Sequence, residues 1–215
     1  MRVIVTCGPS YEPIDRVRRL TNFSTGELGL LLAAALARSG HDVICLKGEG
    51  ATSRVDPGRT EVIPFSTNED LLREFGALAE HRGIDAVFHA AALCDYRVKT
   101  VRGAEGTALT GSKFPTGEGD LTLSLEPAVK LLPRLRDLFP AARIVGWKFE
   151  LDGSRDDALT RARRQLEECR TNACVLNGTA WGGGFGFIEP GREPVPSADK
   201  SSLCAFLSDW LMRKN

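Results

Sequence analysis

Short apolar runs alternate with amphipathic stretches along most of the chain. Runs of β-branched and other apolar residues predict buried strands at 2–6, 41–46, 60–64, 84–91, 121–125, 142–150 and 173–176. Apolar residues at helical spacing predict helices at 24–40, 68–81, 127–138, 156–170 and 198–214. This alternation predicts an α/β protein with a doubly wound, mostly parallel sheet and helices on both faces, a Rossmann-like fold.

Three stretches lack this alternation. Residues 8–25 are polar and predict a long loop directly after the first strand. Residues 97–119 are rich in Gly, Thr and Lys and predict a long, mobile flap loop, while 182–191 predict a glycine-rich turn or hairpin. No flexible linker divides the chain, so we expect a single domain over residues 1–215.

The loop after the first strand carries the most informative pattern. A simple dinucleotide-binding domain has a tight G-x-G-x-x-G turn here, but this chain has TCGPSYEPIDRVRRLTNFSTGELG. Ser24 and Glu27 have the spacing of a capping box, which predicts a helix that begins at Ser24. The free N–H groups at a helix N-terminus attract anions. On spacing alone, Ser24 could equally be a simple cap and Asn22 a simple turn residue.

Charge and composition limit the possible partners. Lys plus Arg and Asp plus Glu number 28 each, so the basic excess that is typical of nucleic-acid binders is missing, and we expect no nucleic-acid partner. We also expect no membrane partner and a cytoplasmic location, because no apolar run has membrane-spanning length and the first residues are typical of a strand. Six cysteines lack C-x-x-C or metal-ligand spacing, which indicates reduced, buried thiols.

Five sequence blocks, in order along the chain, resemble one known family. They are Glu12-Pro13-Ile14-Asp15 with Val17-Arg18 and Asn22-Phe23-Ser24-Thr25-Gly26; HAAALCDYRV at 89–98; Ser112-Lys113-Phe114 followed by GDLTLSLEP; VGWKFE at 145–150; and ACVLNG at 173–178. Together they resemble the phosphopantothenate–cysteine ligase (phosphopantothenoylcysteine synthetase) family, the C-terminal domain of the DNA/pantothenate metabolism flavoproteins. The match extends over most of the chain.

The resemblance implies a specific reaction. Family members couple 4'-phosphopantothenate to cysteine in coenzyme A biosynthesis, through an acyl-nucleotidylate made from CTP in most bacterial members or ATP in eukaryotic ones. Mg²⁺ assists, and the members are homodimers. Because the chain has no flavin-binding domain before these blocks, the resemblance also implies a separate phosphopantothenoylcysteine decarboxylase in the same pathway.

The resemblance also implies roles for individual residues. Asn22 matches the asparagine near the acyl-nucleotidylate, and we expect it to hold the carboxylate or acyl oxygen. Lys113 matches the flap lysine that contacts the nucleotide phosphates, and Asp95 matches a nucleotide-site aspartate. The other matched positions are expected to bind substrate or nucleotide: Gly8, Ser24, Thr25, Gly26, Ala91, Ala92, Trp147, Lys148, Phe149, Glu150 and Asn177. No metal ligands are indicated.

Departures from the family pattern keep a second interpretation open. Glu27-Leu28 stands where many bacterial members have Lys-Met, and Lys113-Phe114-Pro115 lacks a second basic residue. The blocks NFSTG and GWKFE are closer to the eukaryotic style, so CTP and ATP remain alternatives. A non-catalytic or diverged nucleotide-binding paralogue is therefore also possible.

Other interpretations are simpler. An NAD(P)-dependent reductase on this fold would need a Tyr-x-x-x-Lys pair, but Tyr96 is followed by a lysine at three residues rather than four. Considered alone, Lys113 predicts a solvated loop residue, His89 a core histidine and the basic residues of 161–164 a solvated helix face.

Overall fold

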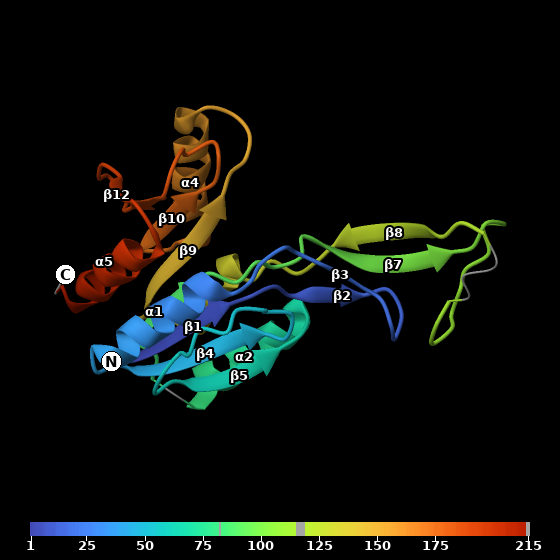
Figure 1. Cartoon of the computed structure of the whole chain (residues 1–215), viewed down its shortest axis with the longest axis horizontal. Coiled ribbons are helices and arrows are strands. Elements are labelled where there is room, and N and C mark those ends of the chain that lie inside the picture. Colours follow the sequence, from blue (N-terminus) through green and yellow to red (C-terminus); the bar gives the residue numbers. More distant parts are fainter. Residues whose placement is uncertain (82, 115–118, 214–215) are drawn as a thin grey trace.

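The computed structural model describes residues 1–81, 83–114 and 119–213, and its centre is an eight-stranded sheet (Figure 1). The strands of this sheet are β1 (Arg2–Cys7), β4 (Asp42–Gly48), β5 (Glu61–Phe65), β6 (Ala86–His89), β9 (Arg143–Phe149), β10 (Ala173–Asn177), β11 (Phe185–Ile188) and β12 (Val195–Ser197). Their order across the sheet is β12-β11-β10-β9-β6-β1-β4-β5. The six strands from β10 to β5 are parallel, and β11 pairs antiparallel with both β10 and β12.

The strand order has a direct consequence for the site. When only the six parallel strands are numbered along the chain, their order across the sheet is 3-2-1-4-5-6, the Rossmann order. The direction of winding reverses between β1 and β6. In open α/β sheets ligands bind at the carboxyl ends of the strands beside such a switch point. The predicted α/β fold is confirmed.

Helices cover both faces of the sheet, as predicted. They are α1 (Glu27–Arg38), α2 (Asn68–His81), the 3₁₀ turn η1 (Leu132–Arg134) with α3 (Leu135–Leu138), α4 (Arg155–Cys169) and α5 (Lys200–Met212). Helices α1 and α5 pack on one face, where alternate residues of the central strands, such as Val3 and Val5, are fully buried. Helices α2 and α3 pack with Ile4 on the other face, and α4 covers β10 there. No helix of the described residues has both the length and the apolar character that crossing a membrane requires.

Two antiparallel ribbons project from the carboxyl edge of the sheet (Figure 1). One joins β2 (Tyr11–Pro13) to β3 (Arg19–Thr21), and the other joins β7 (Tyr96–Arg102) to β8 (Thr122–Pro127). The prediction that residues 8–25 and 97–119 form unbroken loops was therefore wrong in part. The alternating pattern from Tyr96 to Val101 is that of a strand. Residues 115–118 of the predicted flap lie outside the described residues.

The segment 127–138 also differs from its prediction as one helix. Residues 128–131, before η1, are neither helix nor strand, and the backbone N–H of Ala128 donates to the Asp95 carbonyl at 2.9 Å. Pro133 stands in the first turn of η1, where its missing N–H costs nothing. The predicted glycine-rich hairpin at 182–191 is present as the turn into β11 and its antiparallel neighbours.

Candidate active site

A turn lined by glycines joins the carboxyl end of β1 to the start of α1. Gly8 and Gly26 have φ values of 79° and 78°, a conformation that strongly favours glycine. A Cβ on Gly26 would lie 3.0 Å from Ala51 Cβ and 3.2 Å from Gly8 N, and one on Gly8 would lie 2.7 Å from Ala51 Cβ. The backbone is thus packed closely at the switch point, with a helix N-terminus directed at it.

Gly29 completes this arrangement from within α1. A Cβ at Gly29 would lie 2.3 Å from Cys7 Cβ, so the helix can pack this closely on β1 only without a side chain there. Gly8, Gly26 and Gly29 therefore divide among them the roles of the three glycines in a dinucleotide-binding turn. The chain between Gly8 and Gly26 leaves the turn as the β2–β3 hairpin, which is why the contiguous motif is missing. The Gly26-x-x-Gly29 pair was the sequence signal that we overlooked.

The predicted capping box at the start of α1 is wrong. The helix begins at Glu27 and its N-cap is Gly26, so no N-cap side chain makes a hydrogen bond, although Thr25 Oγ1 accepts from Glu27 N at 3.4 Å. The left-handed conformation of Gly26 places Ser24 and Thr25 ahead of the cap, and Glu27 forms an ion pair with Lys200 instead. The first N–H groups of α1 are consequently not capped by Ser24, and an anion can approach them.

Asn22 is brought against the segment that follows β6. Its Nδ2 donates to the carbonyls of Ala92 at 3.1 Å and Leu93 at 2.9 Å. The same segment continues the sheet beside Gly8, because Ala92 N donates to Gly8 O at 3.0 Å and Ser10 N donates to Ala92 O at 3.2 Å. The structure therefore places the predicted residues Gly8, Asn22 and Ala92 together at the switch point, with Ala91 next in the chain.

The carboxyl ends of β9 and β10 form a second group of predicted residues. Glu150 N donates to Asn177 O at 2.9 Å. The Glu150 carboxylate lies 3.3 Å from Lys148 Nζ and 2.7 Å from Arg161 Nε, the latter as an ion pair rather than a well-directed hydrogen bond. Arg161 was predicted to lie on a solvated helix face. Its role at this strand end was missed because the sequence spacing does not reveal a contact between α4 and β9.

Two aromatic residues of β9 lie beside this group. Trp147 Nε1 is buried and has no acceptor among the described residues, while the Trp147 carbonyl accepts from Gln165 Nε2 at 3.2 Å. Phe149, at the end of the strand, is exposed over 62% of its surface. The exposed ring of Phe149 at a strand's carboxyl end suits contact with a planar ligand.

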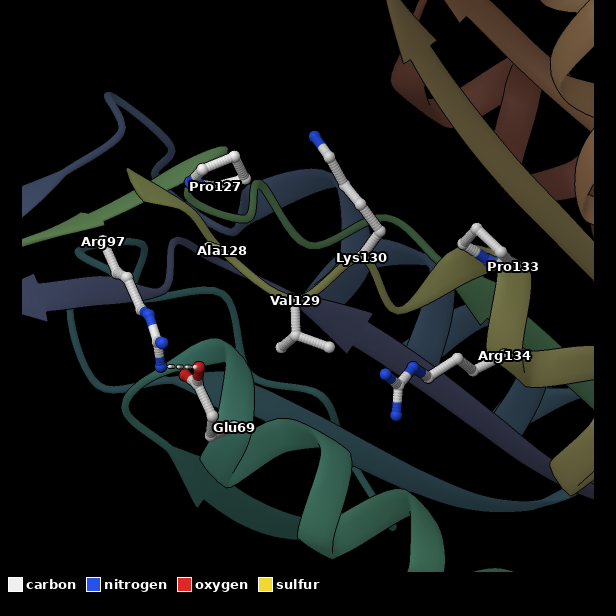
Figure 2. Close-up of a pocket in the computed structure, with 8 residues that line it drawn as sticks. All are labelled: Glu69, Arg97, Pro127, Ala128, Val129, Lys130, Pro133 and Arg134. Atoms are coloured by element: carbon white, nitrogen blue, oxygen red, sulfur yellow. Dashed lines mark hydrogen bonds and ion pairs between the residues drawn. The ribbon is translucent and has the colours of Figure 1, made fainter. Parts of the chain in front are cut away.

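A cationic cavity of about 440 Å³ opens next to Asp95. Figure 2 shows its lining residues, which are Glu69, Arg97, Pro127, Ala128, Val129, Lys130, Pro133 and Arg134. Lys130 forms an ion pair with Asp95, and Arg97 Nη1 lies 3.5 Å from Glu69 Oε1. None of these lining residues was a predicted site residue, and those of 127–134 were missed because 127–138 was interpreted only as an apolar helix. Lys130 and Arg134, four residues apart, were the available signal.

Lys113 is the predicted residue that the structure does not bring to Asn22. Its neighbours dock on the far turn of the β2–β3 hairpin: Arg16 N donates to Ser112 O at 3.0 Å, and Phe114 N donates to Asp15 Oδ2 at 3.2 Å. Asn22 lies at the opposite, sheet-proximal end of that hairpin. Within one chain, Lys113 and Asn22 are thus held at the two ends of a ribbon.

The described residues contain no group of three or more His, Cys, Asp or Glu side chains that could hold a metal ion. All six cysteines are free and buried, as predicted.

Comparison with known proteins agrees with the blocks in the sequence. Residues 1–190 match the model of the DNA/pantothenate metabolism flavoprotein C-terminal domain. The chain is 30% identical over 176 residues to the Coenzyme A biosynthesis bifunctional protein CoaBC of Thermococcus kodakarensis, with 82% of this chain and 41% of that protein aligned. It is 32% identical over 185 residues to the protein of the same name from Bacillus subtilis, covering 86% and 42%. The chain thus spans about four-tenths of these relatives.

Solved structures share the fold. The DNA/pantothenate metabolism flavoprotein from Streptococcus pneumoniae superimposes with a TM-score of 0.84 over 98% of both chains at 21% identity. A Cab2 mutant in complex with phosphopantothenate-cysteine superimposes with a TM-score of 0.71 over 98% of this chain and 87% of that chain at 19% identity. The family match over 190 residues and the shared fold lead to one conclusion: the chain belongs to the family of the DNA/pantothenate metabolism flavoprotein C-terminal domain, the phosphopantothenate–cysteine ligase family.

Proposed function

We propose that this chain is a ligase that couples 4'-phosphopantothenate to cysteine in coenzyme A biosynthesis. In the proposed reaction the pantothenate carboxylate attacks the α-phosphate of a nucleoside triphosphate, CTP or ATP. Pyrophosphate leaves, and the cysteine amine then displaces the nucleotide from the acyl-nucleotidylate. The bifunctional relatives that carry coenzyme A biosynthesis in their names support this assignment.

One observation carries the proposal. The glycine-lined turn places the N–H groups at the start of α1 next to Asn22, which is itself fixed on the carbonyls of Ala92 and Leu93. Activation of a carboxylate by a triphosphate brings several negative charges together, so it needs fixed donors and a positive helix end. We assign the phosphate of the acyl-nucleotidylate to the start of α1, beside Gly8 and Gly26. We assign the acyl oxygen to Asn22, whose Nδ2 has two protons to donate and would exchange one of its two carbonyl contacts for this oxygen.

The remaining predicted residues take supporting roles in this proposal. Trp147, Phe149 and Asn177 at the ends of β9 and β10 offer surface for the nucleotide base, with Lys148 and Glu150 as their charged neighbours. Mg²⁺ would be held by the triphosphate and would neutralise its charge. Ser24 and Thr25, ahead of the helix cap, remain candidates for phosphate contact.

The proposal is tested by formation of the product. We expect phosphopantothenoylcysteine, identified by mass spectrometry, when the protein is incubated with Mg²⁺, 4'-phosphopantothenate, cysteine and either CTP or ATP. Parallel incubations with each nucleotide alone determine which one is used. Absence of product with both nucleotides would contradict a ligase, and nucleotide binding without product would support the diverged paralogue.

The position of Lys113 supports a second part of the proposal, a homodimer. The two ribbons extend from the sheet and expose Val17, Tyr96 and Leu125 over 65%, 56% and 46% of their surfaces. Lys113 is held near the far turn of the β2–β3 ribbon, away from Asn22 of the same copy. We propose that the two ribbons reach a second copy, so that Lys113 of one copy contacts the nucleotide bound beside Asn22 of the other.

We also propose that the pathway uses a separate decarboxylase and that the enzyme is located in the cytoplasm.

Mixing two impaired variants tests whether Lys113 acts across copies. We expect Lys113→Gln to lower turnover at least about tenfold, since one charge contact in the transition state contributes more than ~1.4 kcal/mol. Co-refolded Asn22→Ala and Lys113→Gln chains should regain about a quarter of wild-type turnover, because half of the dimers would hold one intact site. Mixtures no more active than their parents would contradict action across copies.

The cationic cavity provides a further prediction. We propose that Lys130 and Arg134 bind an anionic part of the substrates. Lys130→Gln should raise KM for the nucleotide or for 4'-phosphopantothenate about tenfold, measured by steady-state pyrophosphate release. Lys99→Gln is the matched control, because Lys99 and Lys130 side chains are both 61% exposed but only Lys130 lines the cavity. Equal KM values for the two variants would contradict a role of the cavity in substrate binding.

A further inference from the structure

A buried pair of side chains lies directly beneath the segment that Asn22 contacts. Thr6 of β1 and His89 of β6 are neighbours across the parallel strands, and both are buried. Thr6 Oγ1 and His89 Nδ1 are 2.9 Å apart. His89 was predicted to be a satisfied core histidine, and this contact confirms it.

The same hydroxyl reaches the backbone of the site. Ala91 N donates to Thr6 Oγ1 at 3.0 Å. A hydroxyl can accept one hydrogen bond while it donates its own proton, so Thr6 can serve the Ala91 N–H and the imidazole at once. Burial lowers the pKa of His89 to about 4, which keeps the ring neutral near pH 7 and able to accept that proton.

Most polar backbone groups of the segment after Ala91 also have partners. Ala92 and Leu93 carbonyls accept from Asn22, and Cys94 N donates to Ser10 Oγ at 2.8 Å. The Cys94 carbonyl accepts from Asn68 Nδ2 at 2.8 Å. The backbone N–H of Leu93, in contrast, has no hydrogen-bond acceptor within the described part of the chain.

We propose that Thr6 and His89 are positioning residues of the ligase site, which fix residues 91–94 so that Asn22 and the unpaired Leu93 N–H are presented to the substrate in one orientation. The inference rests on the proposed function. Neither side chain touches substrate. Their effect passes through the Ala91 N–H, which begins the segment, and a rigid support of this kind is what a preorganised site requires.

Replacement of Thr6 by two residues of similar size tests the proposal. Thr6→Val keeps the shape but loses the hydroxyl, whereas Thr6→Ser keeps the hydroxyl. We expect Thr6→Val to lower kcat about tenfold with KM for the nucleotide changed less than about twofold, and Thr6→Ser to stay within about twofold of wild type. A general loss of structure would not spare KM, and the melting temperature of each variant checks the fold.

A second measurement does not depend on activity. Amide hydrogen exchange at Ala91 should be at least about tenfold faster in Thr6→Val than in wild type or Thr6→Ser. Unchanged exchange, or a folded Thr6→Val variant with wild-type kcat, would overturn the positioning role. If the wild-type chain forms no product at all, the proposed function fails, and exchange at Ala91 still decides whether Thr6 fixes the segment.

Discussion

Replacement of Asn22 by aspartate is expected to lower turnover about a hundredfold, a loss of about 2.7 kcal/mol of transition-state stabilisation. Asn22 Nδ2 donates to two carbonyls, those of Ala92 and Leu93. A carboxylate cannot donate, so it would face two carbonyl oxygens and would also repel the anionic substrates. Steady-state product formation with saturating nucleotide measures the effect.

The matched control for this prediction is Asn22→Ala. It removes the two hydrogen bonds without adding a charge, so we expect a smaller loss of roughly tenfold. The difference between the two variants isolates the effect of the charge. If Asn22→Asp forms product at the wild-type rate, Asn22 has no part in the mechanism.

Gly29→Ala is expected to destabilise the protein by about 3 kcal/mol, because the added methyl group would overlap β1. The new Cβ would lie 2.3 Å from Cys7 Cβ and 3.1 Å from the Thr6 carbonyl oxygen, so the helix would have to move off the strand. For a chain of this size that corresponds to a fall in melting temperature of roughly 6–12 °C. Thermal unfolding followed by circular dichroism measures it.

Gly76→Ala is the control for Gly29→Ala, since Gly76 also lies within a helix, α2. A Cβ at Gly76 would meet no atom within 4 Å. Alanine is the better helix former, so this variant should be more stable than wild type by about 0.5–1 kcal/mol. Similar stabilities for the two variants would contradict the close packing of α1 on β1.

The six parallel strands of the main sheet were predictable because most of them are buried on both faces. Continuous apolar runs such as 2–6 follow directly from that burial. The helical spacing of apolar residues at 68–81 follows from the burial of one face of α2. The two ribbons were not predictable in the same way. Their strands are partly exposed and mix charged with apolar residues, so a weak period of two in Tyr96–Arg102 was obscured by polar neighbours.

The structure brings together those predicted site residues that are close in sequence to a strand end, whereas contacts that cross the fold were not predicted. Gly8, Ala92 and Glu150 follow strands and Asn177 ends one, so the topology alone brings them to one edge. The N-cap of α1 was misplaced because the left-handed turn at Gly26 depends on Ala51 and Gly8, which are distant in sequence. The docking of 112–114 on the hairpin turn likewise depends on a tertiary contact that no local pattern indicates.

Release of pyrophosphate in the absence of cysteine tests the central claim most directly. That claim is that the start of α1 and Asn22 together bring a triphosphate and a carboxylic acid into one pocket. With Mg²⁺ and CTP or ATP, addition of 4'-phosphopantothenate alone should produce a burst of about one pyrophosphate per active site. No 4'-phosphopantothenate-dependent pyrophosphate with either nucleotide would contradict it.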